Sequence, residues 1–479
     1  MPSAPTTRTI LALAWPVILA RSAQAVVGFT DAAMVAVLGE DALAATTSAA
    51  LNSTAIFILP MGVVFMGQSF AAQLGGQGDA AGARRYAWYA LALAAVSTLV
   101  YLAVIPAAAP LVGLLAYTPA VQALMAQYIA IRLLAAGAVV GAEGLGNWYG
   151  GLGDTRLSML SSVVMMVVNV ALNWVLIYGN LGAPALGVAG AAWASVIASW
   201  TGFAAVALYF AFDRGERALA RLAAARAAGE PLPAVEPGPL PPPSATPRPN
   251  LREFARMLRF GLPNGVNWFL EFAAFLAFVN FIVAGLGTTS VAALMAVIQL
   301  NSISFMPAFG ISSAGAILVG QAIGAGGHDL VPTIVARTAR ITVTWQGLVG
   351  LVYVTFPTPL MMIFAADAGA GEASAVAATG AVLLAISAAW QVFDALAMAL
   401  GEALRAAGDT AWCLFARISL AWLVWLPLAY LVVRVAGGEA AAATWVMVVY
   451  FIALVIVLGW RFRGGAWRRI DLTGRAAVH

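Results

Sequence analysis

The stretch that decides the fold is PLPAVEPGPLPPPSATPRPN, residues 231–250, in which nine of twenty positions are proline. Proline cannot donate the backbone hydrogen bond that a helix needs, so this composition is typical of an extended or disordered tether. The residues before it, DRGERALARLAAARAAGE (213–230), can form a basic amphipathic helix on a membrane surface. We therefore predict that residues 213–256 are a soluble Arg/Pro-rich linker without a folded domain, and that the chain divides around it.

Both parts of the chain are too apolar for a soluble protein. Of the 479 residues, 62% are hydrophobic and 9% are charged, whereas soluble domains carry roughly 25% charged residues. Lipid must therefore be the solvent for much of the chain, which we predict to be an all-α polytopic membrane protein. The single cysteine, Cys413, and the two histidines exclude a disulfide framework and a Cys/His metal cluster. No basic stripe indicates binding of nucleic acid.

Apolar stretches of about 20 residues are long enough to cross a bilayer, and six lie on each side of the linker. They are residues 10–37, 44–72, 86–111, 121–145, 157–179, 187–212, 257–284, 290–322, 338–364, 376–402, 411–434 and 441–462. The prediction is an N-lobe (1–212), a C-lobe (257–464) and a tail (465–479). Prolines inside the spans are the expected bending points, because they remove a backbone donor: Pro16, Pro60, Pro263 and Pro307.

Arginine placement orients the chain, since cytoplasmic loops carry an excess of basic residues. In the twelve-span arrangement the arginines of the short loops, the linker and the tail fall on one side, with Arg434 as the exception. The linker, the tail and both termini are therefore expected in the cytoplasm.

The two halves contain the same short motifs in the same order. Leu38-Gly39 corresponds to Leu286-Gly287, Gly62 to Gly310, QLGGQG (73–78) to QAIGAG (321–326), and GLGDT ending at Thr155 to RAAGDT ending at Thr410. Because each half has six spans, the repeats share one orientation across the membrane. Transporters commonly use such repeats for alternating access around a site near the middle of the membrane, so we favour transport over a channel or a scaffold.

Four acidic residues lie inside proposed spans: Asp31, Glu143, Glu271 and Asp394. A carboxylate at mid-span costs about 3 kcal/mol or more, and such residues usually face a protein interior or a wet cavity. For Asp31, Glu271 and Asp394 we predict a role in coupling and binding. Glu143 is as well explained by a structural contact.

Helical spacing places further polar or aromatic side chains on the same faces. Gln24 and Gly28 share a face with Asp31, and Gly28 is expected to permit close helix approach. The candidate cavity-lining residues are Gln24, Asn169, Asn173, Asn267, Phe275, Gln299, Asn301 and Gln391. Carboxylates in such a cavity can exchange a proton for another cation or hold Na⁺, and aromatic faces attract organic cations. Arg21 is expected to neutralise Glu271 or Asp394, or to reach towards the cytoplasm.

These residues resemble the MATE (multidrug and toxic compound extrusion) transporters. WPVILARSAQAVVGFTDAAMVAVLGEDALAA (15–45), GLPNGVNWFLEFAAF (261–275), QVFDALAMALGEALRAAGDT (391–410) and GGLGDTR (150–156) are similar to signatures of that family. Glu271 and Asp394 resemble its bacterial NorM-like branch. In the eighth span this chain has Ala296-Val297 where many members carry a His-Gln pair, which leaves Gln299 and Asn301 as the polar candidates there.

The resemblance implies a secondary active antiporter that exports organic cations in exchange for Na⁺ or H⁺, acting as a monomer in the bacterial inner membrane without a cofactor. It assigns Asp31 to the N-lobe cavity, and Glu271 and Asp394 to a cation site, which would be a Na⁺ site. One alternative is a flippase for lipid-linked sugars, which would need a basic cavity; the interior is expected to be acidic, with Arg21 and Arg132 as the only exceptions. A membrane-embedded enzyme is disfavoured because the loops are short.

Overall fold

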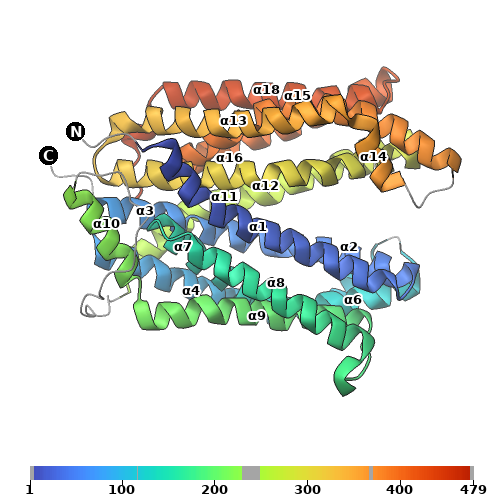
Figure 1. Cartoon of the computed structure of the whole chain (residues 1–479), viewed down its shortest axis with the longest axis horizontal. Coiled ribbons are helices and arrows are strands. Elements are labelled where there is room, and N and C mark those ends of the chain that lie inside the picture. The colour runs from blue at the N-terminus through green and yellow to red at the C-terminus, as the bar shows by residue number, and fades with distance from the viewer. Residues whose placement is uncertain (1–4, 116, 229–248, 366–369, 475–479) are drawn as a thin grey trace. The chain divides into compact units, whose positions relative to one another are not determined.

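The computed structural model describes residues 5–115, 117–228, 249–365 and 370–474, and all regular structure among them is helical (Figure 1). The main helices of the first half are α1 (Thr7–Ala36), α2 (Glu40–Phe65), α3 (Gly67–Gln77), α4 (Ala80–Val104), α6 (Pro119–Leu133), α7 (Ala136–Gly151), α8 (Arg156–Tyr178), α9 (Val188–Asp213) and α10 (Glu216–Ala228). Those of the second half are α11 (Leu251–Ala277), α12 (Thr288–Gly324), α13 (Val331–Thr355), α14 (Pro357–Ala365), α15 (Ala370–Ala406), α16 (Thr410–Ile418) and α18 (Ala440–Arg463).

These helices reproduce the predicted twelve spans. Among the described residues, ten helices are long and apolar enough to cross a membrane, and the number is twelve when each of two bent helix pairs is counted as one span. The bent pairs are α6 with α7, at 49°, and the 328–355 segment with α14, at 84°.

The large bends do not fall at the expected prolines. Helices α1, α2, α11 and α12 continue through Pro16, Pro60, Pro263 and Pro307. The 84° bend follows Phe356, whose φ of −128° and ψ of 46° lie outside the helical region. Pro357 comes next, and a residue before proline is disfavoured in the α conformation.

The chain forms two compact units. Among the described residues, the first is formed by residues within 16–265, and the second by residues within 5–15 and 266–474. In the first unit α8 and α9 lie side by side (Figure 1). They approach closely because Gly202 leaves room for the backbone of α8, and the Ser161 hydroxyl donates to the Gly202 carbonyl at 2.8 Å.

The amphipathic helix expected after residue 213 is confirmed as α10. It begins after Gly215, whose φ is +75° and which lies against the Trp148 ring, and Glu216 pairs with Arg84 at 2.7 Å. Of the proline-rich tether predicted at residues 231–250, residues 231–248 lie outside the described residues.

The repeated motifs adopt matching backbone conformations in the two halves. Three pairs of equivalent glycines have positive φ, a region that favours glycine: Gly39 (109°) and Gly287 (98°), Gly78 (81°) and Gly326 (78°), and Gly153 (89°) and Gly408 (92°). Gly39 and Gly287 both precede the first residue of a spanning helix, α2 and α12. The repeat in the sequence is therefore also a repeat of local structure.

Candidate functional site

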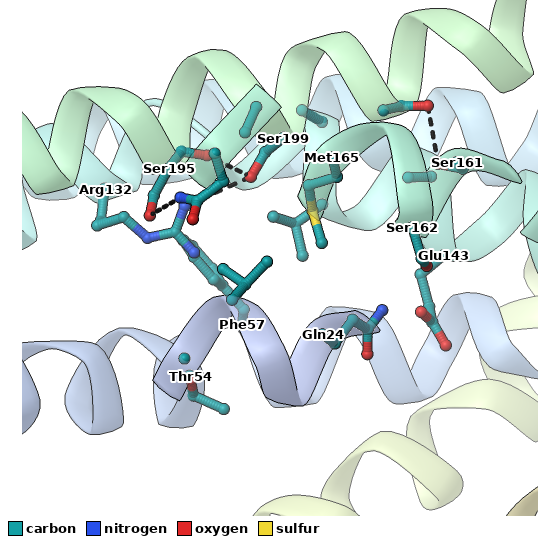
Figure 2. Close-up of a pocket in the computed structure, with 18 of the residues that line it drawn as sticks. Gln24, Thr54, Phe57, Arg132, Glu143, Ser161, Ser162, Met165, Ser195 and Ser199 are labelled. Carbon is teal, nitrogen blue, oxygen red and sulfur yellow. Dashed lines mark hydrogen bonds between the residues drawn. The ribbon is translucent and has the colours of Figure 1, made fainter. Parts of the chain in front are cut away.

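A cavity of about 360 Å³ lies within the first unit, lined by α1, α2, α6, α7, α8 and α9 (Figure 2). Arg132, Ser195 and Ser199 gather at one end of it, while Gln24 and Glu143 lie at the other. The cavity thus carries charged groups at both ends.

Asp31 of α1 is 8% exposed and its carboxylate is held by neutral donors. Asn173 of α8 donates its side-chain amide to Oδ1 at 2.5 Å, and the Ser195 hydroxyl of α9 donates to Oδ2 at 3.1 Å. Asn169 supports both, because it donates to Ser195 at 3.1 Å and accepts from Asn173 at 3.2 Å. Neutral donors replace part of the lost hydration without cancelling the charge. The structure therefore brings together three residues that the sequence singled out, Asp31, Asn169 and Asn173.

Arg132 of α6 lies at the same end of the cavity. Its charge acts on Asp31, its Nη1 is 3.5 Å from the Ser199 hydroxyl, and its guanidinium lies over the Phe57 ring at 5.8 Å. Arg132 forms no ion pair within the described part of the chain.

At the other end, Glu143 is neutralised by Arg21. The guanidinium donates to both carboxylate oxygens, at 2.6 and 3.3 Å, and Asn147 adds a third contact at 2.9 Å. Arg21 also donates to Gln24 at 3.1 Å. The expectation that Arg21 neutralises Glu271 or Asp394 is therefore wrong, because Glu143 takes both of its terminal nitrogens.

Gly28 lies on the wall of the cavity and not at a contact between two helices. A Cβ atom built on it meets nothing within 4 Å. The expectation that Gly28 permits close helix approach is wrong, and its missing side chain keeps part of the cavity open.

In the second unit, Glu271 of α11 pairs with Arg417 of α16 at 2.8 Å. Asp394 of α15 lies within the electrostatic reach of both. The prediction of only two basic residues in the interior overlooked Arg417, the single charged residue of the apolar stretch 411–433.

A neutral polar network surrounds Gln391, which lies about one helical turn before Asp394 on α15. Gln391 donates to Asn301 at 2.5 Å, and the Ser304 hydroxyl lies 3.3 Å from the Gln391 oxygen and also bonds Gln346. The other candidates stand apart from this network: Gln299 is exposed, Phe275 is half-buried, and Asn267 is buried with its Oδ1 unpartnered within the described residues.

The described residues contain no group of three or more His, Cys, Asp or Glu side chains arranged to hold a metal. A Na⁺ ion at Glu271 and Asp394 would therefore need amide, hydroxyl or backbone oxygens as additional ligands, and it would have to compete with Arg417 for Glu271.

One family model, MatE, matches this chain twice, at residues 16–175 and 263–431. The chain belongs to the MATE family. Because one match falls in each half, the family model also confirms the internal repeat.

Curated relatives of this MATE protein cover most of its length. A protein of Chromobacterium violaceum named as a probable multidrug resistance protein NorM is 28% identical over 88% of this chain and 85% of its own. A protein of Pseudomonas putida with the same name is 27% identical over 99% of this chain and 98% of its own.

Solved transporter structures share the fold. A MOP superfamily transporter from Pyrococcus furiosus aligns with a TM-score of 0.83 at 19% identity, covering 98% of both chains. An outward-facing multidrug resistance MATE transporter aligns with a TM-score of 0.81 and the same identity and coverage. Together with the spans, these matches make the chain a multi-pass membrane protein of the MATE fold.

Sequence reasoning missed Ser195 and Ser199 of α9, which complete the Asp31 end of the cavity. Their spacing of four residues puts both on one face of the helix. Serine is common in membrane helices, however, so the spacing alone does not separate a binding serine from a packing one.

Proposed function

We propose that this MATE protein is a multidrug efflux antiporter that exports organic cations in exchange for Na⁺ or H⁺ by alternating access. The observation that carries the proposal is Asp31, a buried carboxylate in a cavity, held by neutral donors. The names of the curated relatives, multidrug resistance protein NorM, support the same function.

The proposed chemistry is competition for a carboxylate. Asp31 binds either the cationic group of a substrate or a proton. Its neutral hydrogen-bond donors stabilise the carboxylate but leave its negative charge available to either of them. Asn169 and Gln24 would line the substrate path, with Phe57 and Tyr128 supplying aromatic surface. Asn173 would hold the Asp31 carboxylate.

Glu271 and Asp394 are the proposed second coupling site. The pair would take up Na⁺ or a proton as Arg417 moves away from Glu271, which it contacts at 2.8 Å. Gln391 and Asn301 would supply amide oxygens beside this site.

The alternatives are less well supported. The flippase alternative is not favoured, because the relatives carry multidrug resistance names. We propose no enzymatic activity, since the solved structures of this fold are described as transporters.

The proposal includes a location. The protein would act as a monomer in the bacterial inner membrane, with both termini, the linker at residues 213–256 and the tail at 465–479 in the cytoplasm. The arginine distribution supports this orientation.

The test is export of a fluorescent organic cation from proteoliposomes under a Na⁺ gradient or a proton gradient imposed separately. We expect one gradient to drive export and its collapse by a matching ionophore to stop it. Export that neither gradient drives would overturn the antiporter proposal.

A further inference from the structure

Three arginines form a stripe along one side of the first turns of α11. Arg252, Arg256 and Arg259 follow i, i+4, i+7, which places them on one face of the helix over about 10 Å of its axis. Arg252 and Arg259 are exposed, and Arg256 is partly exposed. None of the three forms an ion pair with an acid of the described residues. The arginine stripe therefore presents three positive charges to the surroundings of the helix.

The opposite face of this part of α11 is packed within the first unit. Met257 is fully buried, and the Phe254 ring contacts Tyr89 with the centroids 5.7 Å apart. A Cβ atom built on Gly261 would come within 2.8 Å of the Val63 side chain. These contacts fix the rotation of the helix, so the arginine stripe cannot turn inward without breaking them.

The nearest acid in the sequence does not neutralise the stripe. Glu253 is the single acidic residue among residues 251–270. Arg85 of α4 donates to both of its carboxylate oxygens, at 2.6 and 2.8 Å, and the Tyr89 hydroxyl donates to one of them at 3.2 Å. Because Arg85 cancels the charge of Glu253, the arginine stripe keeps its net charge.

The fold supplies carboxylates to other arginines near helix ends. Arg84 pairs with Glu216 and Arg461 with Asp409, each at 2.7 Å. By contrast, like charges one turn apart destabilise a helix, and a cation in the first turn opposes the helix dipole. The arginine stripe therefore costs stability, and an anion from outside the chain would offset that cost.

Beyond Arg259 the exposed side of α11 becomes apolar. Leu262 is 46% exposed and Phe269 is 41% exposed, on the same side of the helix. A change from basic to large apolar side chains is typical of a spanning helix that passes from the headgroup layer into hydrocarbon. Side chains tilt towards the start of their helix, so that of Arg259 extends back towards the headgroups.

We propose that the arginine stripe of α11 is a binding site for the phosphate groups of anionic phospholipids. Guanidinium groups match phosphate oxygens with paired, charge-assisted hydrogen bonds, and basic clusters beside a spanning helix attract anionic headgroups. A free phosphate would meet the same guanidinium groups, but only a lipid would also cover the apolar surface that begins at Leu262. The proposal goes beyond the transport function and does not depend on it.

The test measures thermal melting of the purified full-length protein in a neutral detergent. Dioctanoylphosphatidylglycerol, dioctanoylphosphatidylcholine or glycerol phosphate is added at equal concentration, and a ligand that binds only the folded state raises the melting temperature. We expect a rise with the anionic lipid and almost none with the other two. An equal rise with the neutral lipid would overturn the proposal. An equal rise with glycerol phosphate would indicate a site for free anions and would also overturn it.

Variants identify the residues responsible. Each of Arg252→Gln, Arg256→Gln and Arg259→Gln should weaken the apparent affinity for the anionic lipid about fivefold, the factor that one arginine near an anionic surface supplies. The triple variant should lose the response to this lipid. Without lipid it should melt like the wild type, because Arg and Gln have similar helix propensities. A lower melting temperature there would mean that the stripe already holds an acid of the chain, and the proposal would fail.

A second triple variant controls for net charge. Arg156→Gln, Arg340→Gln and Arg463→Gln remove three exposed arginines from α8, α13 and α18. Combined, they change the net charge by the same amount but should leave the response to the anionic lipid intact. If both triple variants lose the response, or if neither does, the stripe is not the binding site.

Discussion

The side-chain amide of Asn173 donates to the carboxylate of Asp31 at 2.5 Å, across 142 positions of the chain. With the hydroxyl of Ser195 on the other oxygen, α8 and α9 hold the acid of α1 in place. Both donors are neutral, so they fix the geometry of the carboxylate but leave its charge for a ligand or a proton.

Asp31→Asn should abolish export while leaving the protein folded. The amide can accept from Asn173 and donate to Ser195, so the loss of stability should not exceed that of one hydrogen bond, about 1 kcal/mol. What is lost is the charge. Dye export in proteoliposomes and thermal melting in detergent measure the two effects separately. Asp41→Asn, at an exposed position in α2, is the control, and full export by Asp31→Asn would remove the acid from the mechanism.

Gly28 should limit the size of the substrate. Because a Cβ at this position meets open space, Gly28→Ala should melt close to the wild type, with at most the small gain expected for Gly to Ala within a helix. Gly28→Leu should fill part of the cavity and weaken binding of a large dye at least several-fold, with much less effect on a small cation. Affinities for a large and a small cation, measured on both variants, check this. Equal loss for both would instead indicate a distorted helix.

Most of the fold could be predicted from the sequence, because hydropathy reports directly on which segments have lipid as their solvent. The prolines inside the spans were a poor guide to bends, since four helices continue through them. All twelve spans, the linker helix and the repeat follow from such patterns. The bend at residues 134–135 and the π-helical turns at 278–282, 419–425 and 431–435 do not. These features depend on how neighbouring helices pack, and the hydropathy of a single span carries no information about that packing.

The sequence could predict those site residues that are polar or charged within an apolar span, because such residues are rare there. Asp31, Asn169 and Asn173 stand out from apolar helices, and the structure joins them in one network. The partner of Arg21 was not predictable, because pairing with Glu143 depends on the packing of α1 against α7. Arg417 could have been found by the same criterion that identified Asp31, because it is the single charged residue of the apolar stretch 411–433.

Arg417 should compete with Na⁺ for Glu271. Its Nη1 lies 2.8 Å from the carboxylate, so Na⁺ can use that oxygen only after the guanidinium withdraws. Arg417→Gln frees Glu271 beside Asp394, and a ligand that binds the folded state alone raises the melting temperature. We expect Na⁺, compared with K⁺ at equal concentration, to raise the melting temperature of Arg417→Gln more than that of the wild type. Arg434→Gln is the matched control. In the wild type the Arg434 guanidinium contacts the Phe281 carbonyl. The same Na⁺ effect in all three proteins would exclude competition.

Asp154, in the loop before α8, should make stability depend on pH. Burial raises the pKa of its carboxyl above the ordinary value of 3.8, and Asp213 adds to the rise, although Arg221 at 3.5 Å and Arg156 oppose it. The folded protein therefore binds this proton more tightly than the unfolded chain does. The stabilisation is complete below pH 3.8 and is lost as pH rises through the raised pKa.

Asp154→Asn removes this titration while keeping a group that accepts hydrogen bonds. The melting temperature of the wild type minus that of Asp154→Asn should therefore fall as pH rises from about 4 to 7, the range above the ordinary carboxyl pKa. Asp329→Asn is the control, because the Asp329 side chain is 97% exposed and already hydrated. A difference that rises with pH would mean that the ion pair with Arg221 outweighs burial and that α10 is held to this loop mainly by charge. A flat difference would mean that the two effects cancel, which also contradicts the prediction.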